Sequence, residues 1–133
     1  MKMKIAILGS TGSIGKTLLN IINKDKKKFE IVLLTANKNY RELLNQTKKF
    51  NVQNVIIKNP IAYKNFLKVN ENKKINIYSN FEILNKIFKK KINYTMNSIV
   101  GLDGLNPTLK IIKFTKNIAI ANKESIICGW NLI

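Results

Sequence analysis

Short apolar runs alternate with amphipathic stretches along the whole chain. Two of the runs, residues 5–8 and 31–34, contain no polar residue, which is typical of strands that helices cover on both faces. Weaker runs predict four further strands, at residues 55–57, 75–78, 94–96 and 118–121. The pattern therefore predicts six strands with amphipathic segments between them.

The segments between these strands carry helical signals. The first of them places five aliphatic side chains at helical spacing on one face: Ile14, Leu18, Leu19, Ile21 and Ile22. Three later segments begin with a side chain that can cap a helix N-terminus: Asn39 with Glu42, Ser79 with Glu82, and Asn106 before Pro107. We predict that a helix begins at each of these positions.

Six alternations of strand and helix within one domain of residues 1–133 predict an α/β fold. The expected architecture is Rossmann-like: a doubly wound, mostly parallel sheet with helices on both faces. In such sheets, ligands bind at the carboxyl ends of the strands. Polar and glycine residues that directly follow the predicted strands are therefore the candidate site residues.

The segment after the first strand, residues 9–15, reads Gly-Ser-Thr-Gly-Ser-Ile-Gly. Gly9 suits a tight turn with positive φ, Gly12 leaves room for a diphosphate beside the backbone, and Gly15 allows close packing of the next helix. A helix N-terminus also offers unpaired N–H groups to an anion. The segment therefore predicts a dinucleotide site whose diphosphate is held by Thr11, Gly12, Ser13 and Ile14.

The end of the second strand indicates which dinucleotide binds. Sites for NAD usually have Asp or Glu there, which holds the ribose 2′-hydroxyl. This chain has Asn37, Lys38 and Asn39 instead, with Arg41 shortly after, and Glu30 lies at the opposite end of the strand. Because cations attract a 2′-phosphate and a carboxylate repels it, we expect NADPH rather than NADH.

A second polar cluster, residues 121–125, follows the last predicted strand and reads Ala-Asn-Lys-Glu-Ser. Asn122, Lys123 and Glu124 at a strand end can hydrogen-bond a nicotinamide ribose and a polar substrate. The same spacing also describes an ordinary helix start, with Asn122 as the N-cap and Glu124 near the positive end of the dipole. Spacing alone does not decide between these two interpretations.

The formal net charge of +17 raises the alternative of a basic nucleic-acid-binding module. Arg41, however, is the only arginine among the 24 basic residues, whereas recognition of phosphates and bases favours arginine. The lysines are also spread along the chain, so we predict no nucleic-acid partner. No apolar run approaches the roughly 18 residues that span a bilayer, and Cys128 is the single cysteine. We therefore expect no membrane partner and a cytoplasmic location.

Three segments together resemble the 1-deoxy-D-xylulose 5-phosphate reductoisomerase family: residues 9–15, 100–108 (Val-Gly-Leu-Asp-Gly-Leu-Asn-Pro-Thr) and 121–125, with Cys128 and Gly129 behind the last. Their order and separations match as well, so the resemblance covers essentially the whole chain. It implies a metal-dependent oxidoreductase of isoprene biosynthesis. Such enzymes use NADPH and Mg²⁺ or Mn²⁺ to convert 1-deoxy-D-xylulose 5-phosphate to 2-C-methyl-D-erythritol 4-phosphate, generally as homodimers.

The resemblance also implies a role for each candidate residue. Diphosphate contacts fall on residues 11–14, contacts with the 2′-phosphate on Asn37, Lys38 and Asn39, contacts with the nicotinamide side on Asn122 and Glu124, and substrate binding on Lys123. Many members have glycine where this chain has Asn37, and asparagine is the residue that best replaces glycine in a left-handed backbone.

No residue of this chain matches the family's acidic metal ligands, so the resemblance implies neither a catalytic nor a metal-binding residue within 1–133. It also implies that the family's catalytic and C-terminal domains are absent and that the truncated chain alone is inactive. An alternative enzyme class is another NADP-dependent Rossmann dehydrogenase, such as a semialdehyde dehydrogenase. That class needs an activated cysteine nucleophile, whereas Cys128 is expected within a helix.

Overall fold

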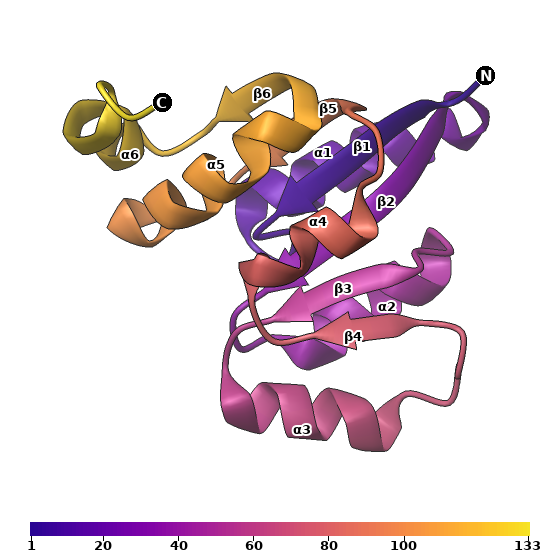
Figure 1. Cartoon of the computed structure of the whole chain (residues 1–133). Coiled ribbons are helices and arrows are strands. Elements are labelled where there is room, and N and C mark those ends of the chain that lie inside the picture. The colour runs from indigo at the N-terminus through magenta and orange to yellow at the C-terminus, as the bar shows by residue number, and fades with distance from the viewer.

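A single six-stranded sheet forms the centre of the molecule in the computed structural model, which describes all residues from Met1 to Ile133 (Figure 1). All five neighbouring pairs of strands are parallel, and the strand order is β4-β3-β2-β1-β5-β6. The six strands are β1 (Met3–Leu8), β2 (Phe29–Ala36), β3 (Asn54–Ile57), β4 (Asn76–Tyr78), β5 (Ile92–Asn97) and β6 (Thr115–Ile120). The predicted doubly wound fold and all six predicted strands are confirmed.

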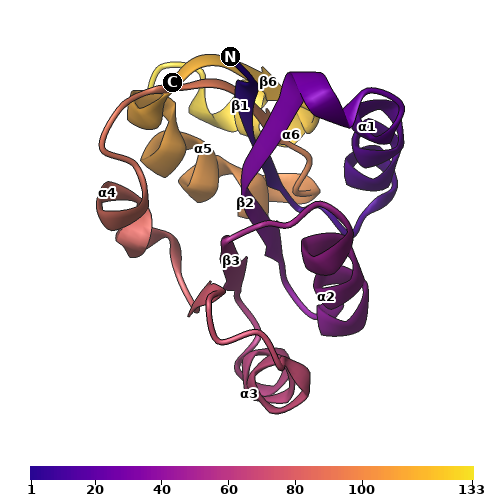
Figure 2. The same cartoon turned by 90° about the vertical axis from the view of Figure 1, so that its right-hand side faces the viewer.

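Helices cover both faces of this sheet, as the pattern predicted (Figure 2). The α-helices are α1 (Ser13–Asn23), α2 (Tyr40–Lys49), α3 (Pro60–Val69), α4 (Leu84–Ile87), α5 (Leu105–Ile111) and α6 (Lys123–Gly129). Four short 3-10 turns join them to the strands: η1 (Lys26–Lys28), η2 (Phe81–Ile83), η3 (Gly101–Gly104) and η4 (Ile112–Phe114). The longest helix has 11 residues, well below the length of a membrane-spanning helix.

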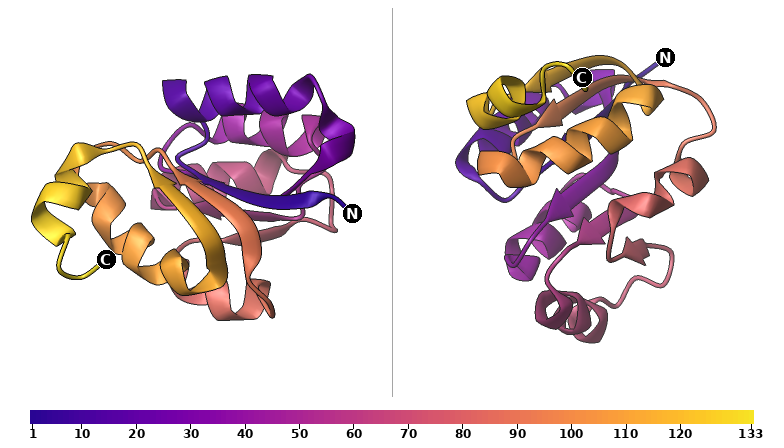
Figure 3. Two further views of the ribbon diagram at one scale, coloured as in Figure 1. Left: turned by 90° about the horizontal axis from the view of Figure 1, so that it is seen from above. Right: turned by 60° about the vertical axis from the view of Figure 1, so that its left-hand side comes forward.

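Two apolar cores flank the sheet, one on each face. Helices α1, α2 and α3 pack on one face, and α4 and α5 pack on the other (Figure 3). Alternate side chains of β1 serve the two cores: Ile5 and Ile7 belong to the first, and Ala6 and Leu8 to the second. A strand with both faces buried needs an uninterrupted apolar run, which explains the sequence of β1.

The predicted apolar face of α1 is partly wrong. Gly15, Leu19 and Ile22 are buried, whereas Ile14 and Ile21 are exposed. Residues that are three or four positions apart lie on one side of a helix, so Gly15, Leu19 and Ile22 form the stripe that faces the sheet. This stripe is narrower than the predicted apolar face. Ile14 lies in the first turn, beyond the edge of that stripe.

Two of the three predicted helix starts are also corrected. Asn80, not Ser79, accepts the hydrogen bond at the start of η2, from the Glu82 amide at 2.9 Å. Asn106 lies inside α5 because η3 leads into that helix without a break, and the N-cap is Gly104. The third start is confirmed, since the Asn39 side chain caps α2.

Candidate functional site

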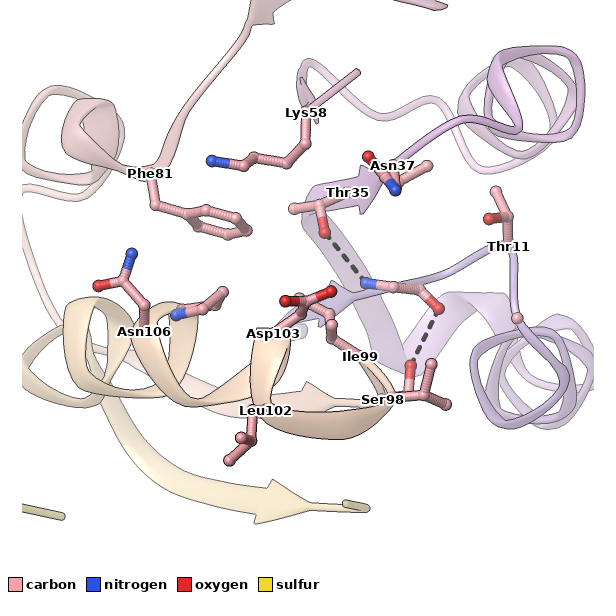
Figure 4. Close-up of a pocket in the computed structure, with 15 residues that line it drawn as sticks. Thr11, Thr35, Asn37, Lys58, Phe81, Ser98, Ile99, Leu102, Asp103 and Asn106 are labelled. Carbon is pink, nitrogen blue, oxygen red and sulfur yellow. Dashed lines mark hydrogen bonds between the residues drawn. The ribbon is translucent and has the colours of Figure 1, made fainter. Parts of the chain in front are cut away.

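The strand order reverses between β1 and β5, and a cleft opens at the carboxyl ends of these strands. Its volume is about 580 Å³, which is within the usual range for small-molecule sites. Figure 4 shows how its walls come from the ends of β1, β2 and β3 and from the segments η2, η3 and α5. The lining residues are Gly9, Thr11, Gly12, Thr35, Ala36, Asn37, Lys58, Phe81, Ser98, Ile99, Val100, Leu102, Asp103, Asn106 and Pro107.

The loop after β1 is held in place by neighbouring strands. Gly9 has a φ of +74°, as predicted for a turn that favours glycine. Its N–H donates to Thr35 Oγ1 at 3.0 Å. Ser98 Oγ, on the other side, lies 2.8 Å from the Leu8 carbonyl oxygen and 3.0 Å from that of Gly9 and donates to this pair (Figure 4).

Helix α2 adds a third support to this loop. Ser10 is fully buried, and its Oγ donates to Gln46 Oε1 at 2.7 Å. Gln46 Nε2 donates in return to the Ser10 carbonyl oxygen at 3.0 Å. The loop therefore has a fixed shape without a ligand, which lowers the entropy cost of binding one.

The N-terminus of α1 is open toward an anion. Gly12 is its N-cap and supplies no side-chain cap, and the first turn contains no acidic residue. In contrast, asparagine side chains cap α2, α3 and α6. The N–H groups of Ser13 and Ile14 have no partner, and the positive end of the helix dipole lies beside them. This geometry suits a phosphate.

The two later glycines of the loop have different surroundings. A Cβ on Gly12 would have only the Gly9 carbonyl oxygen nearby, at 3.6 Å, so the space above Gly12 is open. A Cβ on Gly15 would lie 2.6 Å from Ser10 Cα, inside contact distance. Gly15 therefore allows the first turn of α1 to pack closely on the loop, as predicted, although the neighbour is the loop rather than the strand itself.

Three of the predicted cofactor residues, Thr11, Gly12 and Asn37, line the cleft. Ser13 and Ile14 are exposed in the first turn of α1, next to it. The other predicted residues lie outside the lining: Lys38 and Asn39 on the loop after β2, and Asn122, Lys123 and Glu124 beyond β6.

Asn37 has an ordinary backbone conformation. The only residue other than glycine with a positive φ is Asn51. The left-handed tolerance of asparagine is therefore not what permits Asn37 at this position. Its carbonyl oxygen instead accepts a hydrogen bond from the Asn59 amide at 3.1 Å, which ties the loop after β2 to the loop after β3.

Asn122 is buried and makes two hydrogen bonds at the end of β6. Its Oδ1 accepts from the Ser125 amide at 2.9 Å, which confirms it as the N-cap of α6. Its Nδ2 donates to the Ile99 carbonyl oxygen at 2.7 Å. A side-chain amide has two donor hydrogens and two acceptor lone pairs, so one of each remains for a ligand. The capping interpretation is confirmed, and the ligand role stays a prediction.

Sequence reasoning missed Lys58, Phe81 and Asp103 as cleft residues. Lys58 directly follows the apolar run of β3, so its place at a strand end was a usable signal. Asp103 lies within the 100–108 segment, which was noted only for its resemblance. Nothing in the local sequence marks Phe81, whose position depends on the turn η2 after β4.

Metal-ligating residues do not gather in this structure. No three of its Asp, Glu or Cys side chains come together as a metal site would require. Asp103 is the one carboxylate among the cleft residues. Hard dications need several oxygen ligands, so the residues present do not fit a divalent metal, and we assign none of them to it. Cys128 is an exposed residue of α6 outside the cleft lining.

Residues 5–129 match the family model described as 1-deoxy-D-xylulose 5-phosphate reductoisomerase. A curated protein of that name from Pelagibacter ubique is 61% identical over 132 residues, which are 98% of this chain and 34% of the relative. The counterpart from Clostridium novyi is 39% identical over 135 residues, covering 97% of this chain and 34% of the relative. The chain thus spans about a third of the length of these relatives.

Solved structures give the same correspondence. The reductoisomerase from Zymomonas mobilis in complex with NADPH superposes with a TM-score of 0.88 at 29% identity, covering 99% of this chain and 35% of that one. A second reductoisomerase structure, in complex with NADPH, fosmidomycin and magnesium, has a TM-score of 0.82 at 32% identity, covering 94% of this chain and 31% of that one.

Proposed function

The chain belongs to the 1-deoxy-D-xylulose 5-phosphate reductoisomerase family, and on that premise we propose that it forms the NADPH-binding domain, residues 1–133, of such an enzyme. One observation carries the proposal. A loop fixed by β2, β5 and α2 presents the uncapped N-terminus of α1 beside a cleft of about 580 Å³. An anionic ligand of dinucleotide size suits this arrangement.

Each end of the cofactor has candidate partners in the chain. The diphosphate would lie against Thr11, Gly12, Ser13 and Ile14, where the N–H groups of Ser13 and Ile14 have no partner within the chain. The adenosine 2′-phosphate would lie near Asn37, Lys38 and Asn39, the residues that directly follow β2 and include no carboxylate. The nicotinamide side would lie toward Asn122 and Glu124, with Lys123 available to bind the sugar-phosphate substrate. These assignments follow the order of the strand ends across the sheet.

The activity of the whole enzyme is part of the same proposal. NADPH supplies a hydride when it is bound, and the substrate would be 1-deoxy-D-xylulose 5-phosphate, converted to 2-C-methyl-D-erythritol 4-phosphate for isoprenoid precursors. Mg²⁺ or Mn²⁺ would be held by residues outside this chain. We further propose a cytoplasmic enzyme that acts as a homodimer, without nucleic-acid or membrane partners. What this chain contributes is cofactor binding.

A titration of the 133-residue chain with NADPH and with NADH tests the proposal. We expect saturable binding of both, with NADPH bound at least about tenfold more tightly, because one charge-assisted contact with the 2′-phosphate provides about that factor. Nicotinamide fluorescence reports the binding. Equal affinity for the two dinucleotides, or no saturable binding by the folded chain, would contradict the proposed function.

A further inference from the structure

Lys58 occupies a fixed position on the wall of the cleft. It directly follows β3, and its N–H donates to the Ala36 carbonyl oxygen at 3.1 Å. The next amide, that of Asn59, donates to the Asn37 carbonyl oxygen at 3.1 Å. These two bonds align the backbone of Lys58 with the loop after β2, where the 2′-phosphate is expected.

The ammonium group of Lys58 has no anionic partner within the chain. The structure contains two ion pairs, Lys28 with Asp25 and Lys110 with Glu82. Lys58 Nζ forms no hydrogen bond with the protein and lies 5.9 Å from the centre of the Phe81 ring. The side chain therefore extends across the cleft wall from β3 toward η2, with its three N–H donors unused (Figure 4).

The cleft has opposite charges on two of its walls. Lys58 lies on the wall formed by β2 and β3, and Asp103 enters from η3 (Figure 4). A phosphate is repelled by the carboxylate of Asp103 and attracted to the ammonium of Lys58. A ligand with one extra phosphate would therefore be oriented with that phosphate toward β2 and β3.

We propose that Lys58 binds the adenosine 2′-phosphate of NADPH and thereby contributes to the preference for NADPH over NADH. This inference rests on the proposed function and adds a specificity residue to it. An ammonium–phosphate hydrogen bond is charge-assisted and is lost when the phosphate is replaced by the hydroxyl of NADH. Lys38 precedes α2 and Lys58 follows β3, so the two cations approach the phosphate from different loops.

The test compares Lys58→Met with a matched control, Lys64→Met, in titrations of the chain with NADPH and NADH. Lys64 is an exposed residue of α3 outside the cleft lining, so its substitution removes the same charge at a remote position. We expect K58M to weaken NADPH binding about tenfold and to leave NADH binding within about twofold. K64M should leave both affinities near those of the original chain.

Two further measurements isolate the phosphate contact. The variant Lys58→Arg keeps the positive charge and should keep most of the preference for NADPH. The dissociation constant of adenosine 2′-monophosphate should be higher in K58M than in K64M, whereas that of adenosine 5′-monophosphate should be the same in both. Both K58M and K58R should retain the unfolding midpoint of the original chain, because Lys58 is exposed.

The outcomes separate this inference from the proposed function. If the original chain prefers NADPH but K58M weakens NADPH and NADH equally, or weakens neither, Lys58 does not bind the 2′-phosphate and the inference is wrong. The proposed function would stand in that case. If the original chain binds neither dinucleotide, both the proposed function and the inference are wrong.

Discussion

Gly12 and Gly15 lie three residues apart in one loop, yet they serve different purposes. The space above Gly12 is open, whereas a Cβ on Gly15 would meet three backbone atoms of Gly9 and Ser10 within 2.7 Å. Backbone atoms of a loop that is hydrogen-bonded on three sides cannot move aside at low cost. Gly15 therefore supports the shape of the loop, and Gly12 keeps its outer surface free for a ligand.

Alanine substitutions distinguish the two roles. We expect Gly15→Ala to lower the free energy of unfolding by about 2 kcal/mol, since the steric cost exceeds alanine's helix preference of about 1 kcal/mol. Gly12→Ala should lower it by no more than about 1 kcal/mol, because φ is −78° there, but should weaken NADPH binding by obstructing the diphosphate. Urea unfolding and NADPH titration provide the two readouts. A stable G15A, or a G12A that binds NADPH normally, would contradict these roles.

The sequence predicted the roles of these glycines better than it predicted which lysine side chain lies on the wall of the cleft. The positive φ of Gly9 follows from a sharp turn directly after a strand, which is a local requirement. In contrast, the place of Lys58 on the cleft wall depends on the pairing of β3 beside β2 and on η2 bringing Phe81 close. The position of Lys58 directly after β3 was a usable signal for a strand end, but its place beside Phe81 was not predictable, because local patterns contain little information about such pairings.

Among the elements, α6 depends most on a single side chain. Asn122 caps this helix and also holds the Ile99 carbonyl oxygen, so it connects α6 to the segment after β5. Helix α6 has seven residues, too few to be stable without such contacts. Gly129, one turn from the end of the chain, packs against Leu105 of α5.

Substitution of Asn122 should therefore affect stability apart from any role in binding. We expect Asn122→Ala to lower the free energy of unfolding by about 1–2 kcal/mol, through loss of the cap and of the Ile99 hydrogen bond. Asn122→Ser is the matched control, because serine keeps the cap acceptor but is too short to reach Ile99 in the same way. N122S should lower the free energy of unfolding by less than N122A does. Equal unfolding free energies for N122A and the original chain would show that the cap does not stabilise the fold.

The sequence pattern predicted the positions of the helices and strands better than the residues at which the helices begin. Asn39 was correctly predicted as a cap, and the capping alternative that the spacing left open for Asn122 is confirmed; each follows a strand and precedes an isolated helix. Asn106 was not a cap, because η3 had already started the helical path before it. Whether a helix begins at a capping residue or earlier depends on the preceding turn, which the side chains of the helix do not encode.

At the scale of the whole molecule, the alternation of apolar runs and amphipathic segments was sufficient to predict the fold. Strands β1, β2 and β3 of the sheet are buried on both faces, so most positions in them must be apolar, and these strands can be recognised from the sequence. The glycine loop predicted one end of the site because a sharp turn directly after a strand is a local requirement. The far wall could not be predicted, since η2 belongs to the crossover from β4 back to β5, whereas η3 and α5 belong to the connection from β5 to β6.

The 133-residue chain should bind cofactor without catalysing the proposed reaction. Its acidic side chains form no group that could hold the divalent metal that the proposed reaction would use. We expect no NADPH oxidation above background when the purified chain is mixed with 1-deoxy-D-xylulose 5-phosphate and Mg²⁺. Absorbance of NADPH measures turnover, and fluorescence of the same sample verifies that NADPH is bound. Turnover that purifies with the chain would contradict this expectation.

The hydrogen bonds from Ser98 to the carboxyl end of β1 have a consequence for the order in which parts of the site are synthesised and folded. The glycine loop is synthesised before the hydroxyl that holds the Leu8 and Gly9 carbonyl groups, because that hydroxyl is about ninety positions later in the chain. A contact of such long range cannot form until both segments have been synthesised, and closing the intervening loop costs entropy. During translation, the emerging chain therefore displays its most recognisable nucleotide-binding motif long before that motif has the support it needs to bind.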